Sequence, residues 1–571
     1  MRQKTRKNVH DLRAMLSLFA AMLLSGGCGD SPDVQPSAEA ERPNILLIVA
    51  DDLGYSDIGP FGGEIRTPTL DGLAAEGLRF SGFHVLPTCS PTRSALLSGN
   101  DNHVAGLGVM GEFIYPEIAD LPGYAGHLAD QVATIPEILR EAGYHTYMSG
   151  KWHLGEADVQ SPFARGFEQT FTMMNGGGSH WADMRPLSPP QEMIYRRNGE
   201  RIETLPEDFY SSKDYTDAMI EFIASSKDDG EPFFAYLSFT APHDPLHAPA
   251  DYIAKYSGAY DDGWDALAQR RLASLKEIGL VPPEVNELPD NFMTRAWDGL
   301  SAEEKEEYAR DMEVYAAMVD YLDMSIGRLF DYLRENGLYE NTLIVFFSDN
   351  GANGASPRAY PGNADGSYLA TFDNSTENRG LPGSFIDMGP NWAQASSAPL
   401  RLFKSFTTQG GIRSPLIVKL PGTMDRGGQW SDAFLHVTDV VPTFLEVAGA
   451  TYPDTVGGRA VRRPIGVSMI PILRGTEESV AGNRGVGYEL FEMRAYIQDE
   501  WKLLRLPEPF GTGDWQLYNL TEDPGEIRDV SDAHPEIKAA LIEAWQQYAA
   551  ENDVFDHEGR FDALYRQAYG N

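Results

Sequence analysis

The stretch Pro87-Thr88-Cys89-Ser90-Pro91-Thr92-Arg93-Ser94-Ala95-Leu96-Leu97-Ser98-Gly99-Asn100 organises this chain, because it joins a candidate nucleophile to the start of a helix. Ser90 is a favourable N-cap residue, and Pro91 suits the first helical turn. We therefore expect Cys89 just before a helix N-terminus, where unpaired backbone amides and the helix dipole favour an anion. Arg93 follows four residues later, with a planar guanidinium suited to the oxygens of sulfate, phosphate or carboxylate.

Outside this stretch, apolar runs rich in β-branched residues alternate with helical patterns, which is typical of a mostly parallel sheet covered on both faces. The expected strands span residues 44–50, 144–148, 233–239 and 342–347. The polar residues that follow them are Asp51, Asp52, Lys151, His153, His243, Asp349 and Asn350. Because open α/β sheets bind ligands beyond the carboxyl ends of their strands, we expect these side chains to share one site.

Each of these features has a simpler explanation when it is taken alone. An isolated Cys-x-Pro-x-Arg motif fits a small buried cysteine before an ordinary capped helix. Paired acids after a strand are usually a turn or a helix cap. His243 fits a surface loop, and Lys151 fits a solvated charge. Their joint occurrence in this order favours a catalytic site.

The segment Cys89-Ser90-Pro91-Thr92-Arg93 followed by Leu96-Leu97-Ser98-Gly99 resembles the signature of the type I sulfatases, within the alkaline phosphatase superfamily. The resemblance covers nearly all of residues 43–553 and is closer to the bacterial arylsulfatases than to glycan-specific members. It implies an α/β fold with a large, mostly parallel sheet flanked by helices, and hydrolysis of sulfate monoesters. It also implies that a maturase oxidises Cys89 to formylglycine, whose hydrate is the nucleophile.

The resemblance further implies one bound metal ion. Its ligands would be Asp51, Asp52, Asp349, Asn350 and an oxygen of the modified Cys89. Oxygen ligands of this kind suit a hard divalent cation, and Ca²⁺ fits a carboxylate-rich cage better than zinc, which normally recruits His or Cys. The calcium is the family's ion by analogy.

Cations must flank the sulfuryl group, because its negative oxygens repel nucleophiles and its leaving oxygen departs with charge. The expected clamp consists of Arg93, Lys151 and Lys404. His243, with help from Lys404, would protonate the leaving alcohol or phenol, and Asp349 would assist deprotonation of the nucleophile. His153 would take a proton from the second hydroxyl of the hydrate, which expels sulfate and restores the aldehyde.

Residues 401–415 resemble the family segment in which a lysine precedes Glu-Gly-Gly and then a strand. Lys404 fits the lysine position, whereas Gln409 stands where glutamate is more usual. This difference removes a charge near the site. We expect it to affect fine tuning and to leave the role of Lys404 intact.

Length and charge limit the class of protein further. The chain has 571 residues and is 42% hydrophobic, which is enough for a substantial core and more than one structural unit. Its 46 basic and 84 acidic residues give a net charge of −38, which argues against general binding to nucleic acid or anionic membranes. An anionic substrate therefore requires a local cluster of positive charge.

Residues 1–28 have the pattern of an export signal. Basic residues precede the apolar run 14–24, which is too short for a comfortable membrane span, and Ser25-Gly26-Gly27-Cys28 follows. The small residues resemble a bacterial lipoprotein cleavage site that would leave a lipid anchor on Cys28, and ordinary signal-peptidase cleavage is the alternative. We expect an exported protein, in the periplasm or anchored at the outer membrane, with residues 29–42 as a flexible tether.

The rest of the pattern divides into a catalytic domain at 43–451 and a C-terminal unit at 452–571. Short strand candidates at 494–497, 501–506 and 515–519 and a helix near 537–550 predict a small antiparallel sheet with one helix. The sulfatases have such a C-terminal unit. Between residues 302 and 333, apolar side chains at three- and four-residue spacing predict an amphipathic helix that packs on the large sheet.

Two other functions stay open at this point. A phosphonate monoester or phosphodiester hydrolase would use the same formylglycine and metal framework, because tetrahedral oxyanions look alike to such a site. A catalytically silent, lipid-anchored protein would keep the scaffold to bind sulfated glycans. The complete set of polar residues argues against the silent protein.

Overall fold

The computed structural model describes residues 42–480, 484–555, 565–566 and 568–569. The expected export signal, the tether and Cys28 lie outside the described residues. Arg42–Asn571 forms one compact unit. In the described ranges, no helix combines the length and the hydrophobicity that crossing a bilayer requires.

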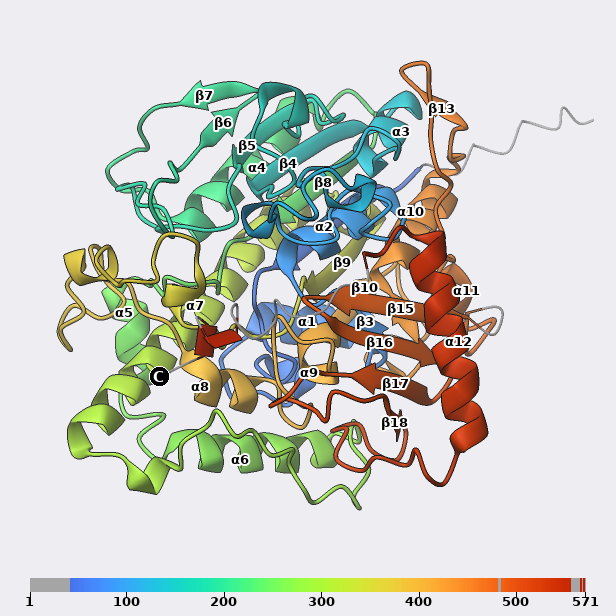
Figure 1. Ribbon diagram of the computed structural model, residues 1–571. Helices are drawn as coiled ribbons and strands as arrows, with labels where there is room; N and C mark the ends of the chain where they lie inside the picture. Colours follow the sequence, from blue (N-terminus) through green and yellow to red (C-terminus); the bar gives the residue numbers. More distant parts are fainter. Residues whose placement is uncertain (1–41, 481–483, 556–564, 567, 570–571) are drawn as a thin grey trace, which may run out of the picture. The chain divides into compact units, whose positions relative to one another are not determined.

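A mixed sheet of ten strands forms the centre of this unit (Figure 1). From one edge to the other its strands are β11 (Trp430–Ser431), β2 (Leu78–Phe80), β10 (Leu416–Lys419), β9 (Thr342–Ser348), β1 (Asn44–Ala50), β8 (Phe233–Ser238), β4 (His145–Lys151), β5 (Gln169–Met173), β6 (Tyr195–Arg197) and β7 (Glu200–Ile202). The block from β9 to β5 is parallel, and β10 and β6 pair antiparallel with its two edges. The predicted fold class is confirmed.

The four predicted strands are four of the five strands in the parallel block. Every residue of β1 and β9 is buried, as expected for apolar strands covered on both faces. The strand predicted at 144–148 is β4, and it continues to Lys151, three residues beyond its predicted end. Gly150 allows this extension, because it has a φ of +111° and a Cβ there would lie 1.8 Å from the carbonyl oxygen of Ser238 on β8.

Helices cover the sheet in two groups (Figure 1). One group consists of α1 (Pro68–Glu76), α4 (Ser211–Ser226) and α7 (Ala302–Glu335), and the other of α2 (Cys89–Ser98), α3 (Ile135–Glu141) and α10 (Val440–Ala448). The predicted amphipathic helix is α7. It begins at a capping box formed by Ser301 and Glu304, and its apolar positions are buried. Further helices are α5 (Ala250–Ile253), α6 (Gly263–Glu277), α8 (Gly389–Ser396), α9 (Gln409–Ile412) and α11 (Ile470–Leu473).

A second sheet follows near the C-terminal end of the chain. Its antiparallel strands are β15 (Gly485–Leu490), β16 (Met493–Gln498), β17 (Trp501–Arg505) and β18 (Gln516–Asn519), covered by α12 (Pro535–Glu551). Trp545 and Leu541 of the helix pack against Leu503 and Leu517 of the sheet. The predicted small sheet with one helix is confirmed. Sequence analysis missed β15, because the two glycines in Gly-Val-Gly-Tyr-Glu-Leu weaken a strand pattern.

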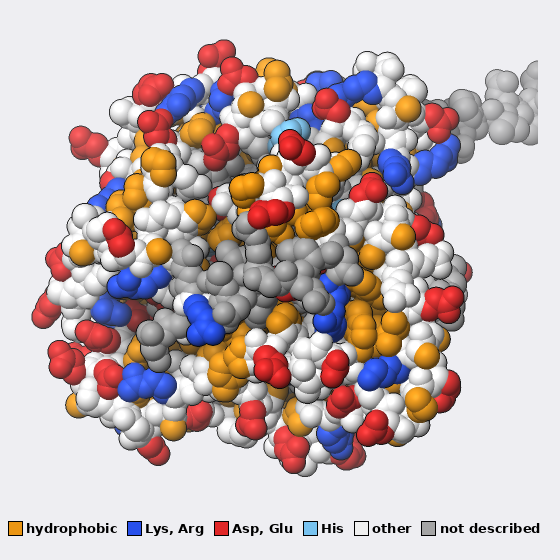
Figure 2. All heavy atoms as spheres, viewed as in Figure 1, with side chains coloured by type: hydrophobic (Ala, Val, Ile, Leu, Met, Phe, Trp, Pro, Cys, Tyr) orange, Lys and Arg blue, Asp and Glu red, His pale blue; other side chains and the backbone are white. Residues whose placement is uncertain are grey.

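Two short pairings complete the described strands. β3 (Phe83–His84) pairs with β12 (Leu435–His436), and β13 (Thr455–Val456) pairs with β14 (Arg459–Ala460). On the face drawn in Figure 2, acidic side chains are spread widely, with basic ones dispersed among them. This distribution agrees with the net charge of −38.

Candidate active site

Helix α2 carries Cys89 at its first residue. Thr88 is extended, with φ −150° and ψ 162°, and its carbonyl accepts the first helical hydrogen bond from Thr92 at 3.2 Å. The prediction that Ser90 caps this helix was wrong. The helix begins at Cys89, and the Ser90 hydroxyl has no hydrogen-bond partner among the described residues. Pro91 still falls in the first turn, where its missing N–H would have had no partner.

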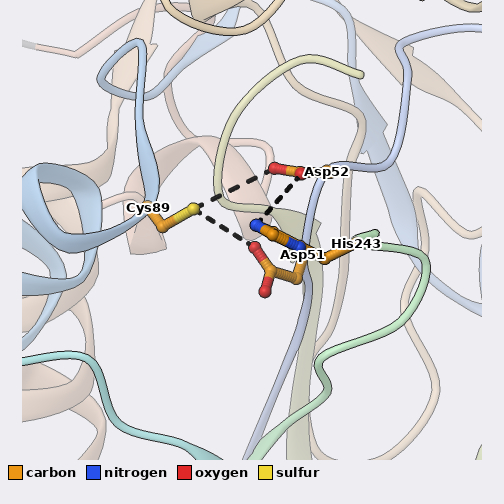
Figure 3. A group of neighbouring side chains, drawn as sticks. All are labelled: Asp51, Asp52, Cys89 and His243. Carbon is orange, nitrogen blue, oxygen red and sulfur yellow. Dashed lines mark hydrogen bonds and ion pairs between the residues drawn. The ribbon is translucent and has the colours of Figure 1, made fainter. Parts of the chain in front are cut away.

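Cys89 lies at the carboxyl end of β1, among the acids that were predicted to gather there (Figure 3). Its thiol donates to Oδ1 of Asp51 at 3.3 Å and lies 4.0 Å from Oδ1 of Asp52. The residue is 1% exposed. Burial and the charge of Asp51 raise the pKa of the Cys89 thiol well above its ordinary value. The unmodified thiol is therefore protonated and a weak nucleophile.

The two acids after β1 each pair with a lysine from a distant segment. Nζ of Lys151, the last residue of β4, lies 2.6 Å from Oδ2 of Asp51. Nζ of Lys404 lies 2.7 Å from Oδ1 of Asp52. Asp52 has a φ of +67°, which turns the chain away from the strand immediately after Asp51. Both lysines are buried, so these ion pairs are shielded from solvent.

Asp349 and Asn350 reach the same place from the end of β9. Oδ1 of Asp349 accepts from the backbone N–H of Asp52 at 3.3 Å, and Nδ2 of Asn350 donates to Oδ1 of Asp52 at 2.7 Å. Both residues are fully buried. Burial and the nearby charge of Asp51 raise the pKa of Asp349.

Arg93 projects from the first turn of α2 into the same cluster. Its Nε lies 2.9 Å from Oδ2 of Asp349, and a terminal nitrogen lies 3.7 Å from Oδ1 of Asp51. The other terminal nitrogen donates to Oγ of Ser238 at 2.5 Å and to the carbonyl of Lys151 at 3.3 Å. The guanidinium therefore connects α2 with the ends of β1, β4, β8 and β9.

His243 lies in the loop after β8, with Nε2 3.6 Å from Oδ2 of Asp52. Its Nδ1 contacts the backbone carbonyl of Asp244 at 2.5 Å. Burial and the charge of Lys404 lower the pKa of His243 well below 6.5, so the imidazole is neutral in this arrangement. Asn353 and Tyr360 hold Asp244 through hydrogen bonds of 2.9 and 3.0 Å to its Oδ1. Both come from the long segment that follows β9.

His153 is paired with an acid that sequence analysis missed. Its Nε2 lies 3.2 Å from Oε2 of Glu112, in the short 3₁₀ helix Gly111–Phe113. Burial raises the pKa of Glu112, but the charge of His153 and its hydrogen bond outweigh that effect and lower the pKa to about 2. Glu112 was missed because it follows no strand. No local motif marks an isolated glutamate in a loop as a partner for a histidine.

The predicted site residues thus lie together in one cluster. Three buried carboxylates, on Asp51, Asp52 and Asp349, face three buried cations, on Arg93, Lys151 and Lys404. Ligand atoms of Asp51, Asp52, Cys89 and His243 all lie within 4.8 Å of one another, close enough to share a metal ion. His243 is the member of this group that sequence analysis did not name as a ligand.

The donor set fits the hard cation that was expected. Oδ1 of Asn350 is buried and has no hydrogen-bond partner among the described residues, while its Nδ2 is held on Asp52. An amide oxygen left free beside carboxylates is a donor of the type that Ca²⁺ takes. The residues Asp51, Asp52, Asp349 and Asn350 therefore offer oxygen atoms from two neighbouring strand ends.

Gln409 is the first residue of α9. Its Oε1 is 3.1 Å from Nε2 of His84, and its backbone N–H donates to Oε2 of Glu526 at 2.7 Å. Burial and the charge of Arg413 lower the pKa of His84 to about 3. A neutral glutamine therefore faces a neutral histidine, and the negative charge at this place comes from Glu526 of the C-terminal region.

A pocket opens beside Cys89. His153, His243 and Lys404 line it together with Glu112, and the remaining walls are largely apolar or aromatic. Six of those wall residues are Met110, Phe113, Leu187, Phe406, Phe491 and Met493. Reactive groups therefore lie at one end of a hydrophobic cavity.

Residues 43–450 match the family model described as sulfatase. The chain belongs to the sulfatase family. Residues 401–551 also match the model of the N-sulphoglucosamine sulphohydrolase C-terminal region. The family predicted from the residues around Cys89 is confirmed.

Relatives in this family align along most of the chain. An uncharacterised sulfatase of Schizosaccharomyces pombe is 44% identical over 535 residues, which covers 90% of this chain and 95% of the relative. An arylsulfatase of Klebsiella aerogenes is 40% identical over 460 residues, which covers 80% of this chain and 96% of the relative. The crystal structure of Ps i-CgsB in complex with a neocarrahexaose has a TM-score of 0.63 at 24% identity, and covers 92% of this chain and 97% of that chain. The last likeness supports the fold alone.

Proposed function

We propose that this sulfatase-family protein hydrolyses sulfate monoesters at a formylglycine made from Cys89, beside a bound divalent cation. One observation carries the proposal: the Cys89 side chain lies 3.3 Å from Asp51, inside a cluster of three carboxylates and three cations. An ordinary structural cysteine has no need of such surroundings.

Asp51, Asp52, Asp349 and Asn350 are the residues that would hold the cation, with calcium as the proposed ion. When bound, it would neutralise sulfate oxygens and ease deprotonation of the nucleophile. His243 is close enough to the same ligand atoms to contribute. The expectation that it protonates the leaving group stays part of the proposal, and it requires His243, which is neutral in this arrangement, to gain a proton before that step.

Oxidation of Cys89 gives an aldehyde, and addition of water to that aldehyde gives a hydrate with two hydroxyls. One hydroxyl would accept the sulfuryl group, and deprotonation of the other would release sulfate. The chain's own residues prepare both steps. Arg93, Lys151 and Lys404 place positive charge around the end of the pocket, where charge shifts during sulfuryl transfer. His153, held by Glu112, is the proposed base for release.

The arrangement explains why cysteine oxidation is needed. A serine at position 89 would accept sulfate but would lack the second hydroxyl that expels it. The pKa of the unmodified Cys89 thiol is raised by burial and by Asp51, so the thiol is a weak nucleophile there. Neither unoxidised side chain provides turnover.

We also propose the domain division at 43–451 and 452–571, export through residues 1–28, the tether at 29–42 and a lipid anchor on Cys28. The sequence pattern of the first 28 residues supports export to the periplasm or the outer membrane. Mass spectrometry of the mature N-terminus tests the anchor. A lipidated Cys28 is expected, and cleavage at another position would contradict it.

The proposal is tested by measuring sulfate release with calcium-loaded protein whose residue 89 has been verified by mass. Aryl, alkyl and glycan sulfates are compared with matched phosphate diesters and phosphonates. We expect sulfate esters to be preferred and Cys89→Ala to abolish turnover without changing the thermal unfolding midpoint. A large preference for diesters or phosphonates would establish the phosphoryl alternative instead. Unmodified Cys89 in the native host, with binding of sulfated glycans, would establish the silent binding protein.

A further inference from the structure

We propose that Tyr565 and Tyr569, close to the C-terminal end of the chain, determine which leaving group the pocket accepts. They would select a flat, uncharged aromatic group over a polyanionic sugar. This inference rests on the proposed sulfate-ester hydrolysis and adds the substrate class and the residues that recognise it.

The two tyrosines form one wall of the pocket beside Cys89. Their rings are stacked on each other, with centroids 4.7 Å apart and planes 29° apart. Both also contact Phe406, at centroid distances of 6.1 Å for Tyr565 and 5.8 Å for Tyr569. An aromatic leaving group entering this pocket would find ring faces and edges of the kind it packs against.

The wall is attached to the catalytic segment itself. Phe403 and Phe406 flank Lys404 in the sequence, and the ring of Phe403 lies 5.9 Å from that of Tyr569. The backbone N–H of Ser356 donates to the carbonyl of Ala568 at 3.0 Å, which ties the terminal segment to the loop after β9. Tyr565 is held separately by a hydrogen bond from its hydroxyl to Sδ of Met293 at 2.6 Å.

The Tyr569 hydroxyl is free for a ligand. It is buried and has no hydrogen-bond partner among the described residues. Burial raises the pKa of Tyr569, and the neighbouring Lys404 ammonium acts in the opposite direction. A buried hydroxyl without a partner costs free energy, so a substrate oxygen that accepts its hydrogen bond gains affinity. Its place beside Lys404 puts that donor next to the ester end of the substrate.

The charges of the pocket oppose a polyanionic substrate. Among the described residues that line the pocket, Lys404 is the only lysine or arginine. Its ammonium is already paired with Asp52. Glu112 adds a negative charge to the wall, and its pKa of about 2 keeps it ionised at neutral pH. A glycan with several sulfates would need additional cations for its other charges. An aromatic ring that carries one sulfate has no other charges and needs no additional cations.

The test compares kcat/KM for 4-nitrophenyl sulfate with kcat/KM for a sugar monosulfate, N-acetylgalactosamine 6-sulfate. For each substrate, the kcat/KM of a variant is divided by that of the wild type, so the different intrinsic reactivities of the two substrates cancel. Tyr565→Ala and Tyr569→Ala should each lower the aryl value about tenfold and leave the sugar value within about twofold. Tyr569→Phe should lower the aryl value less, because it keeps the ring and loses the hydroxyl. Tyr332→Phe, on α7 outside the pocket, also removes a buried unpartnered hydroxyl and should change neither value.

A binding measurement separates this inference from the proposed function. Naphthalene-2-sulfonate has an aromatic ring and an anionic group but no ester bond, so its dissociation constant is independent of turnover. The two alanine variants should weaken its binding about tenfold, with thermal unfolding midpoints showing that they fold. Unchanged binding, or equal losses on both substrates, would overturn the inference. Failure of wild type to release sulfate from any ester would remove the proposed function, while this titration would still decide the role of the tyrosine wall.

Discussion

Arg93 connects side chains and backbone from several strand ends in the candidate site. Its guanidinium contacts Asp349, Ser238 and the carbonyl of Lys151 from a helix that begins four residues earlier. The planar fork of arginine satisfies these partners together, whereas the single ammonium of lysine has a different shape. The role of Arg93 therefore depends on the shape of its guanidinium as well as on its charge.

Arg93→Lys should lower kcat/KM for sulfate esters by about 100-fold or more, because a charge next to the reacting group is displaced. It should also lower the free energy of unfolding, by about 3 kcal/mol, because Asp349 stays buried with poorer pairing. Steady-state kinetics and urea unfolding measure the two effects. Arg196→Lys is the control, since that arginine pairs with Asp158 away from the site. Normal turnover in Arg93→Lys would contradict the clamp.

Glu112→Gln tests whether the carboxylate of Glu112 orients the base His153. The variant keeps a hydrogen-bonding group but loses the charge, so release of sulfate should slow about tenfold or more while KM changes little. Sulfated enzyme should then accumulate at residue 89, which mass spectrometry after rapid quenching detects. Glu168→Gln is a matched control, because Glu168 also lies 3.2 Å from a histidine, His145, and neither residue lines the pocket. Slower turnover without accumulation would place Glu112 in a different step.

At the scale of elements, the strand ends decide where the chemistry lies. β1 delivers Asp51 and Asp52, β9 delivers Asp349 and Asn350, and β4 delivers Lys151. The position of Lys151 depends on Gly150, whose φ of +111° and close approach to the Ser238 carbonyl bring β4 against β8. The ion pair between Lys151 and Asp51 follows from that contact.

Gly150→Ala should destabilise the protein strongly and displace Lys151, because a Cβ there would lie 1.8 Å from the carbonyl oxygen of Ser238. Gly230→Ala isolates the conformational cost, since Gly230 also has a positive φ, of +87°, and has nothing within 4 Å. The control should lose about 1 kcal/mol. Thermal unfolding and sulfate release compare the two variants. An equal effect at both positions would show that the close approach is unimportant.

Sequence analysis predicted the elements whose pattern is local. The runs that became β1, β8 and β9 are continuous and apolar, so their ends and the acids after them could be located. The start of α2 was misplaced because Ser90 is a good cap by composition, whereas the backbone of Thr88 takes that position. Glu112 and Tyr569 could not be predicted, because their importance arises from long-range contacts that leave no periodic signal.

At the scale of the whole molecule, the C-terminal sheet supports the catalytic region through buried charges. Lys502 of β17 lies 2.6 Å from Glu526 and donates to the carbonyl of Thr407 at 2.7 Å. Glu526 in turn accepts from the backbone of Gln409. The glutamate that was expected at position 409 is thus replaced by an acid from a distant part of the chain. Fine tuning of the Lys404 segment then depends on both regions.

A second buried cluster joins α12 and β15 to the loop after α2. His103 lies 3.0 Å from Asp101 and 3.5 Å from Glu489, and the Tyr548 hydroxyl donates to Asp101 at 2.9 Å. The ring of Tyr124 packs edge-on against His103. Burial lowers the pKa of His103, but hydrogen bonds to Asp101 and Glu489 outweigh it and raise the pKa to about 9.

The free energy of unfolding should therefore depend on pH because His103 titrates. Because its pKa is raised on folding, its contribution is complete below pH 6.5 and is lost as pH rises through about 9. The full effect is on the order of 3 kcal/mol. Urea unfolding at pH 6 and pH 10 should show a smaller difference in His103→Gln than in wild type. Identical pH dependence in the two proteins would mean that His103 is neutral in the folded state.

The tie between Ser356 and Ala568 brings the last described residues of the chain to the mouth of the reaction cavity. An affinity tag fused after Asn571 would begin three positions beyond Tyr569. Fusions at this end would then crowd the entrance, and their length and charge would alter measured kinetics. A protease that trims the final residues would change substrate choice while leaving the acids and cations around Cys89 in place.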